Sequence, residues 1–133
     1  MAVARKRVVV TGLGLVTPLA TGVEATWKKL INSESGIRKL EGDEYKLIPS
    51  KVGAKVIRGI EKDQFDFKSY NYPGEKNLSN FTLFGIAAAT QALRDAGLEG
   101  QSEEEKLRTG VCVGSGIGSV EEIAETANLL KVQ

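Results

Sequence analysis

Hydrophobic and polar positions along this chain predict two buried strands separated by helices. Residues 8–11 form an unbroken β-branched run, which is typical of a strand buried on both faces in a parallel sheet. Residues 111–113 form a second apolar run that predicts another buried strand. Each run leads into a glycine-rich turn, at residues 12–14 and 114–118. We therefore expect two strand-to-helix turns.

Helical periodicity is clearest in two segments. One helix is expected to begin near Val23, with Thr21 and Glu24 as a capping box and Gly36 at its end. The other spans residues 79–96, where phenylalanines and small alanines line one stripe and allow close backbone packing. If the chain is part of a larger fold, this stripe should be left exposed as an apolar patch.

Two further helices are predicted from their first turns. Ser102 and Glu105 form a capping box that opens a short charged helix. Ser119 and Glu122 repeat that pattern, and open a last helix with apolar residues on one side.

Residues 37–76 interrupt this order with mixed glycine, proline, charge and aromatics. Val52, Ala54 and Val56 alternate with other residues and predict one short, half-exposed strand. We interpret the segment as a surface excursion of a single domain that spans residues 1–133. The whole pattern predicts an α/β fold with a mixed or partly parallel sheet and helices on its faces. Two central strands make a poor sheet, so the domain looks incomplete.

The amino-acid composition argues against several classes of function. The formal net charge of +1 gives no argument for nucleic acid, and no apolar run reaches the roughly 18 residues of a membrane span. One cysteine excludes an internal disulfide and a cysteine cluster for zinc. Histidine is absent, so no imidazole serves proton transfer within this chain. The basic start is too short for a targeting segment, and we expect the fold to begin directly.

The spaced glycines invite a comparison with dinucleotide-binding turns. In such a site a third glycine opens a helix that receives the pyrophosphate. Here Thr17 stands at that position, Pro18 follows, and the helix begins several residues later. The second turn has no lysine for a phosphate loop. A small dinucleotide-binding domain stays an alternative, but tight turns and close packing explain these glycines better.

One known family accounts for both turns together. The chain resembles the N-terminal part of elongating, type II-like β-ketoacyl-[acyl carrier protein] synthases. The motifs that carry this resemblance occur in the family's order and span almost the whole chain. They are residues 7–14 with Thr17 and Pro18, then Trp27, then residues 35–37, the helix of residues 81–97, and residues 114–118.

The resemblance implies a 3-oxoacyl-[acyl carrier protein] synthase of fatty acid biosynthesis. It implies the first part of the N-terminal half of a thiolase-like fold, a homodimer, no cofactor, and no metal. The partner is acyl carrier protein carrying acyl and malonyl groups. The family's catalytic cysteine and two histidines follow later, so this chain alone is expected to be inactive. We expect a cytoplasmic enzyme, with the mitochondrial matrix or a plastid as the alternative. A non-catalytic partner or remnant of a synthase is the rival interpretation.

The resemblance also points to individual residues. Gly116, Ile117 and Gly118 correspond to a loop that gates the acyl pocket near the dimer interface; alternatively, Ile117 plugs the core beneath the turn. Lys76 corresponds to a basic contact for acidic acyl carrier protein, or is an ordinary solvated lysine. Cys112 lies between valines, does not match the family's nucleophile, and is expected to be a core residue.

Overall fold

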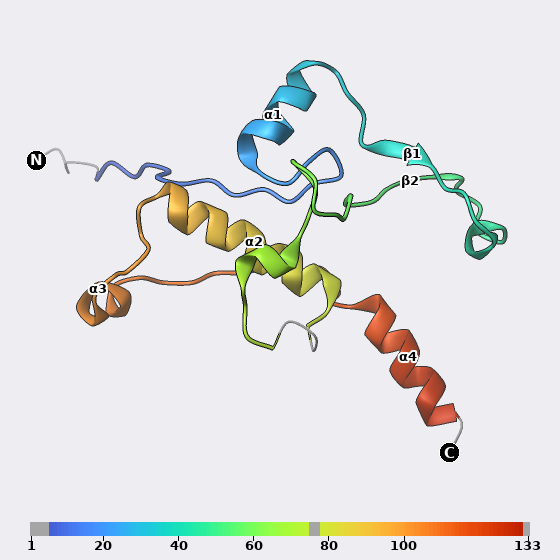
Figure 1. Cartoon of the computed structure of the whole chain (residues 1–133). Helices are drawn as coiled ribbons and strands as arrows, with labels where there is room; N and C mark the ends of the chain where they lie inside the picture. The colour runs from blue at the N-terminus through green and yellow to red at the C-terminus, as the bar shows by residue number, and fades with distance from the viewer. Residues whose placement is uncertain (1–5, 75–77, 132–133) are drawn as a thin grey trace, which may run out of the picture.

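The computed structural model describes residues 6–74 and 78–131. Four α-helices occur in these residues: α1 (Val23–Ile31), α2 (Asn80–Asp95), α3 (Glu103–Leu107) and α4 (Val120–Lys131). Strands β1 (Ile37–Lys39) and β2 (Val52–Ala54) and the 3₁₀ turns η1 (Asp43–Tyr45) and η2 (Phe67–Tyr70) lie between α1 and α2. In Figure 1, α2 occupies the middle of the molecule, and α4 extends away from the other elements.

The four predicted helices are present, but some of them begin or end differently from the prediction. The capping box of α3 is confirmed: Ser102 Oγ accepts from the N–H of Glu105, and the Glu105 carboxylate accepts from Ser102. At α4 the Ser119 hydroxyl accepts from the N–H of Glu122 at 3.2 Å. The capping box predicted for Thr21 is wrong, because Gly22 is the N-cap and supplies no side chain. Instead, the backbone N–H of Thr21 donates to the carbonyl of Asp63 at 2.8 Å.

The end of α1 also differs from the prediction at Gly36. The helix ends at Ile31, and Ser33 then adopts a left-handed backbone conformation with φ of 58°. A non-glycine residue therefore makes the turn that the sequence assigned to a glycine, and Gly36 lies beyond it.

The sheet differs from the expected one. β1 and β2 pair antiparallel, with Ile37 opposite Ala54 and Lys39 opposite Val52. This confirms the alternating strand at Val52. The parallel strands expected at residues 8–11 and 111–113 are not formed in the described residues. Val8 is 93% exposed and Val111 88% exposed, so the described residues leave both runs uncovered. Parallel strands need hydrogen-bonding neighbours and cover on both faces, so an apolar run alone does not make one.

The small core lies between α2 and the segment expected to be a surface excursion. Phe65 and Phe67 are buried with Leu83 and Ala87 of α2, and the rings of Phe65 and Phe84 meet edge to face at 4.9 Å. The aromatic part of the excursion is thus built into the core. The burial of Leu83 and Ala87 also leaves Phe81, on the predicted apolar stripe, 42% exposed.

The first glycine-rich turn packs directly on α2. A methyl group at Gly14 would overlap the carbonyl oxygen of Ala88, and one at Gly12 would overlap that of Ala92. The close packing predicted for the alanine stripe is therefore confirmed, with the turn as its partner. The expected exposure of the stripe is wrong for Ala88 and Ala92, which are half-buried beneath this turn. This contact fits the packing explanation of Gly12 and Gly14 rather than a dinucleotide site at the first turn.

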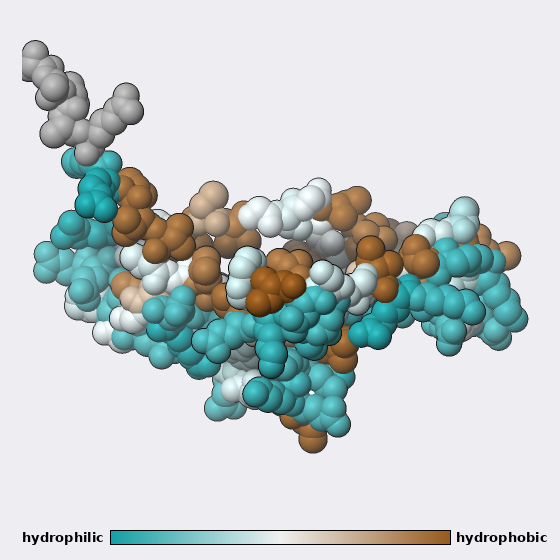
Figure 2. Space-filling view, turned by 90° about the horizontal axis from the view of Figure 1, so that it is seen from above, coloured by the Kyte–Doolittle hydropathy of each residue, from teal (hydrophilic) through white to brown (hydrophobic). Residues whose placement is uncertain are grey.

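Hydrophobic side chains remain on the surface over much of the molecule (Figure 2). They include the β-branched runs near both ends and the apolar side of α4, where Ile123 is 56% and Leu130 68% exposed. No described helix has the length and apolar character to cross a bilayer.

Candidate functional site

The glycine-rich loop of residues 114–118 precedes α4 and keeps a defined turn. The N–H of Gly118 donates to Ser115 Oγ at 3.2 Å, and Gly118 has φ of 82°, a conformation that favours glycine. Ile117 is 74% exposed. It therefore does not plug the core beneath the turn, which was one of the two expectations for it. A methyl group at Gly116 would meet no described atom within 4 Å, so close packing does not require a glycine there.

Polar side chains tie the helix after this loop to α2. Arg58 donates to Asn80 Oδ1 at 2.5 Å, and Asn80 Nδ2 donates to a carboxylate oxygen of Glu121 at 3.3 Å. Gly118 lies against the ring of Phe81, since a methyl group at Gly118 would stand 3.9 Å from Phe81 Cζ. The loop therefore sits at the N-terminal end of α2. Sequence reasoning missed this bridge, because no periodicity relates residues so far apart in the chain.

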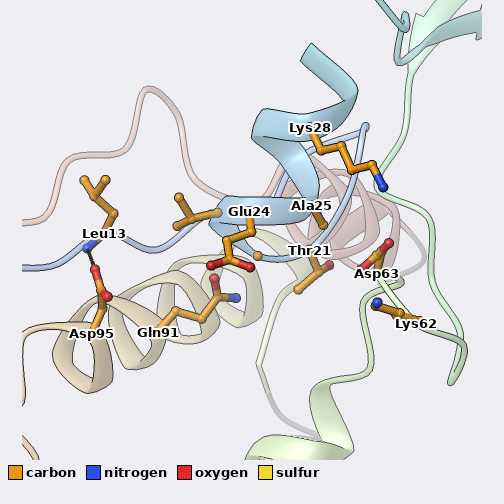
Figure 3. Close-up of a pocket in the computed structure, with 11 residues that line it drawn as sticks. Leu13, Thr21, Glu24, Ala25, Lys28, Lys62, Asp63, Gln91 and Asp95 are labelled. Atoms are coloured by element: carbon orange, nitrogen blue, oxygen red, sulfur yellow. Dashed lines mark hydrogen bonds between the residues drawn. The ribbon is translucent and has the colours of Figure 1, made fainter. Parts of the chain in front are cut away.

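A separate hollow lies between α1 and the C-terminal end of α2. It measures about 740 Å³ and is lined by Glu24 and Lys28 of α1, Lys62 and Asp63, and Asp95. Figure 3 shows Glu24 and Gln91 facing one another across it, while Asp95 accepts from the N–H of Leu13. Three carboxylates outnumber two ammonium groups here, so the hollow disfavours a phosphate despite the adjoining N-terminus of α1.

This hollow is separate from the glycine-rich loop. Gln91 and Asp95 line the hollow, whereas Asn80 and Phe81 adjoin the loop. Asn80 and Gln91 are eleven residue steps apart on the helix, which corresponds to about 16 Å. The hollow therefore does not extend the loop into a larger pocket.

Cys112 does not lie where the sequence placed it. It is a free, exposed cysteine, because the strand expected around it is not formed. The prediction of a buried core residue is therefore wrong for this structure. No group of three or more potential metal ligands occurs within the described part of the chain. Lys76 falls outside the described residues.

The geometry defines a helix-rich chain with a glycine-rich loop at one end of α2 and, in the described residues, no assembled set of catalytic side chains. The family model described as "Beta-ketoacyl synthase, N-terminal domain" matches residues 5–132. The chain therefore belongs to the β-ketoacyl synthase family, acyltransferases of fatty acid biosynthesis, as its motifs implied.

Individual relatives agree with this assignment. The chain is 43% identical over 141 residues to the mitochondrial 3-oxoacyl-[acyl-carrier-protein] synthase of Arabidopsis thaliana, with 96% of this chain and 30% of the relative covered. It is 35% identical to 3-oxoacyl-[acyl-carrier-protein] synthase 2 of Rhizobium meliloti, with 95% and 30% covered. For synthase 2 of Vibrio cholerae the identity is 37%, with 89% and 27% covered. The chain thus spans less than a third of the length of these relatives.

Proposed function

We propose that this chain supplies the N-terminal part of a 3-oxoacyl-[acyl carrier protein] synthase. The observation that carries the proposal is the family match over residues 5–132, together with relatives that bear this enzyme's name. The reaction moves an acyl group from its carrier thioester to a cysteine thiolate and releases the carrier thiol. Malonyl-[acyl carrier protein] then loses carbon dioxide, and the resulting carbanion attacks the acyl-cysteine. The product is 3-oxoacyl-[acyl carrier protein], and the thiolate is free again.

The chain's own contribution to this chemistry is structural. It contains no histidine, and its one cysteine does not match the position of the family's nucleophile. We therefore assign the thiolate and the two histidines to the part of the enzyme that this chain does not span. The 133 residues alone should not condense acyl groups.

A thiolase-like fold for the whole enzyme is supported by the two uncovered apolar runs. Val8 and Val10 are 93% and 79% exposed, and Val111 and Val113 are 88% and 82% exposed. β-Branched residues favour strands, and burial on both faces stabilises a parallel sheet. We propose that both runs become sheet strands when the rest of the enzyme covers them, and that the whole enzyme is a homodimer.

The residues 116–118 are the proposed acyl-pocket gate. An exposed apolar side chain between two glycines suits this role, because the side chain can swing on a permissive backbone. The bridge from Asn80 to Glu121 anchors the start of α4 behind the loop. We propose that the loop around Ile117 moves while the start of α4 stays in place.

For the compartment we propose mitochondria, one of the two alternatives to the cytoplasm, the other being a plastid. The Arabidopsis thaliana relative carries a mitochondrial designation, whereas the Rhizobium meliloti and Vibrio cholerae relatives are bacterial. Fractionation of the source cells, followed by detection with an antibody to this segment, tests the assignment.

The proposed function is tested on the native protein, captured from its source with the same antibody. We expect an intact mass far above 14.3 kDa and the formation of 3-oxoacyl-[acyl carrier protein] from acyl- and malonyl-[acyl carrier protein]. The recombinant 133-residue chain serves as the inactive control. A native mass of 14.3 kDa would end the condensing proposal and favour a non-catalytic partner of another synthase.

A further inference from the structure

Three polar side chains from three separate segments connect the core to the first turn of α4. Arg58 Nη2 donates to Asn80 Oδ1 at 2.5 Å, and Asn80 Nδ2 donates to a carboxylate oxygen of Glu121 at 3.3 Å. These three side chains are here called the polar anchor. Asn80 is the first residue of α2, and Glu121 is the second residue of α4. The polar anchor therefore joins the N-terminal ends of the two helices.

The direction of both hydrogen bonds is fixed by the chemistry of the two end groups. A guanidinium group has only donors, and an ionised carboxylate has only acceptors. The amide of Asn80 must therefore turn its oxygen toward Arg58 and its nitrogen toward Glu121. An aspartate at position 80 would keep the acceptor for Arg58 and lose the donor for Glu121.

The first member of the polar anchor is held by the aromatic core. The guanidinium carbon of Arg58 lies 5.8 Å from the centre of the Phe65 ring and 5.5 Å from that of the Phe84 ring. The backbone is fixed on both sides of Arg58, since the N–H of Phe65 donates to the Ile57 carbonyl at 2.8 Å, and the N–H of Gly59 donates to the Phe65 carbonyl at 3.2 Å. Phe65 itself is buried. The polar anchor thus begins at a fixed point of the core.

The last member of the polar anchor lies directly behind the proposed acyl-pocket gate. Glu121 follows Gly118, the last residue of the gate, by three positions. A methyl group at Gly118 would stand 3.9 Å from Phe81 Cζ, so α2 contacts the gate as well as the helix after it. Asn80 and Phe81, adjacent residues of α2, therefore contact the first turn of α4 and the last glycine of the gate.

The first turn of α4 does not need the polar anchor in order to be helical. The N–H of Glu122 donates to Ser119 Oγ at 3.2 Å, and the N–H of Ile123 donates to the Ser119 carbonyl at 3.1 Å. A carboxylate in the first turn also favours the helix, whether or not it bonds to Asn80. Loss of the polar anchor should therefore release the position of this turn and leave its helical structure in place.

We propose that Asn80 is a positioning residue that limits how far the gate opens and so sets the preference for acyl-chain length, an inference that rests on the proposed function. With the polar anchor intact, residues 116–118 move against a fixed first turn of α4. When the bond from Asn80 to Glu121 is lost, this turn can follow the loop, and a wider opening becomes accessible. Long acyl groups need the wider opening, whereas the shortest ones do not reach the gate.

A swap of donor and acceptor tests the polar anchor in the 133-residue chain. Asn80→Asp sets two carboxylates against each other and should accelerate amide hydrogen exchange at Gly118, read by NMR, about fivefold. Adding Glu121→Gln supplies an amide donor for the new carboxylate and should return the rate to within about twofold of the original. Glu121→Gln alone keeps an acceptor for Asn80 and should change the rate by about twofold or less.

The matched control for the added charge is Ser79→Asp. It places the same charge at the N-cap of α2, where aspartate is favoured, and leaves the amide of Asn80 in place. Exchange at Gly118 should then stay within about twofold of the original rate. An equal acceleration in Asn80→Asp and in the double variant would overturn the polar anchor, as would unchanged exchange in Asn80→Asp.

The preference for chain length is tested in a whole enzyme, a fusion of this chain with the remaining part of the Arabidopsis thaliana relative. Asn80→Asp should raise the ratio of kcat/KM for the longest accepted acyl group to that for the shortest about threefold. Adding Glu121→Gln should restore the ratio, and Ser79→Asp should not change it. A merely structural defect would lower kcat/KM equally for all acyl lengths. That result, or an unchanged ratio, would overturn the role in chain length.

The role of Asn80 and the proposed function can fail separately. If the unaltered fusion condenses acyl groups and Asn80→Asp leaves the ratio unchanged, only the role of Asn80 is wrong. If the native protein forms no 3-oxoacyl product, the synthase assignment is wrong and the role in chain length falls with it. Exchange at Gly118 then still decides whether the polar anchor holds the loop.

Discussion

The backbone N–H of Leu13 donates to Oδ2 of Asp95 at 2.9 Å, although 82 positions separate the two residues. One helical turn earlier, Gln91 Oε1 accepts from the N–H of Leu15 at 3.1 Å. Two residues of extended chain advance about 6.6 Å. Four residues of helix advance about 6 Å. Because these distances match, one side of α2 satisfies successive donors along one edge of the N-terminal segment.

This relationship predicts the effect of Asp95→Ala. The Leu13 N–H would lose its partner, which costs about 1 kcal/mol for a typical hydrogen bond. Hydrogen exchange at Leu13 should then accelerate about fivefold. Exchange read by NMR checks this, with Glu34→Ala as the control, since Glu34 is an exposed carboxylate away from this segment. Unchanged exchange at Leu13 would mean that the bond does not hold the segment on α2.

Two glycine substitutions should have opposite effects on stability. Gly14→Ala would force a methyl group into the Ala88 carbonyl and should lower the free energy of unfolding by about 2 kcal/mol or displace the segment. Gly85→Ala makes the same chemical change inside α2, where the space is open, and should raise it by about 0.5–1 kcal/mol. Amide hydrogen exchange within α2, which reports the free energy of opening without a cooperative transition of the whole chain, provides the measurement for both variants. Equal effects would contradict the close packing of the turn on α2.

These residues show which structural features could be predicted from the sequence and which could not. Local signals predicted the helices and the Ser102 cap, because spacing and capping chemistry act within one or two turns. Close packing of the alanine stripe could be predicted, but the identity of its partner, Gly14, could not. The runs containing Val8 and Val111 read as buried strands because β-branched residues prefer covered sheets. Burial, however, depends on neighbours far away in the chain, and in this structure both runs are exposed.

The candidate site also contains one feature that could be predicted from the sequence and one that could not. The motif around Ile117 could be found by its glycines and by its family resemblance. The bridge from Arg58 through Asn80 to Glu121 could not, because it joins three segments through polar side chains that follow no pattern. The pairing of β1 with β2 could not be predicted either, since only one of the two strands alternates in the sequence.

The cap of α3 predicts a dependence on pH. The backbone N–H of Ser102 and then its hydroxyl donate to the Glu105 carboxylate, and these bonds lower the pKa of Glu105 below its ordinary value. A lowered pKa in the folded state means that the cap stabilises α3 above the unfolded pKa of about 4.3. This contribution is lost as the pH falls through the lower, folded value. Ser102→Ala removes the hydroxyl but keeps the backbone N–H, so the pKa of Glu105 should rise part of the way toward its ordinary value, as an NMR titration of the carboxyl carbon would show.

Exposed β-branched runs predict self-association of the isolated chain. Val9 is 67% and Val111 88% exposed, and uncovered strand-forming segments pair with other chains. Sedimentation velocity should show oligomers, and Val9→Lys/Val111→Lys should shift the distribution toward monomer. Leu47→Lys, at a site that is 97% exposed outside both runs, should leave it unchanged. A monomer with one sharp, cooperative unfolding transition would contradict the view that these runs await a missing part of the fold.

The last prediction concerns Ile117 and is made in a whole enzyme. A chimera that joins this chain to the remainder of the Arabidopsis thaliana relative supplies the residues that the chain does not span. If Ile117 gates the acyl pocket, Ile117→Phe should lower kcat/KM for long acyl groups by about tenfold or more, since a bulkier gate closes the deep part of the pocket. The shortest acyl group should be affected about twofold or less, because it does not reach the gate. Ile60→Phe, at a position 91% exposed in the segment before α2, is the matched control and should change neither value. Activity that falls equally for all acyl lengths would assign Ile117 a purely structural role.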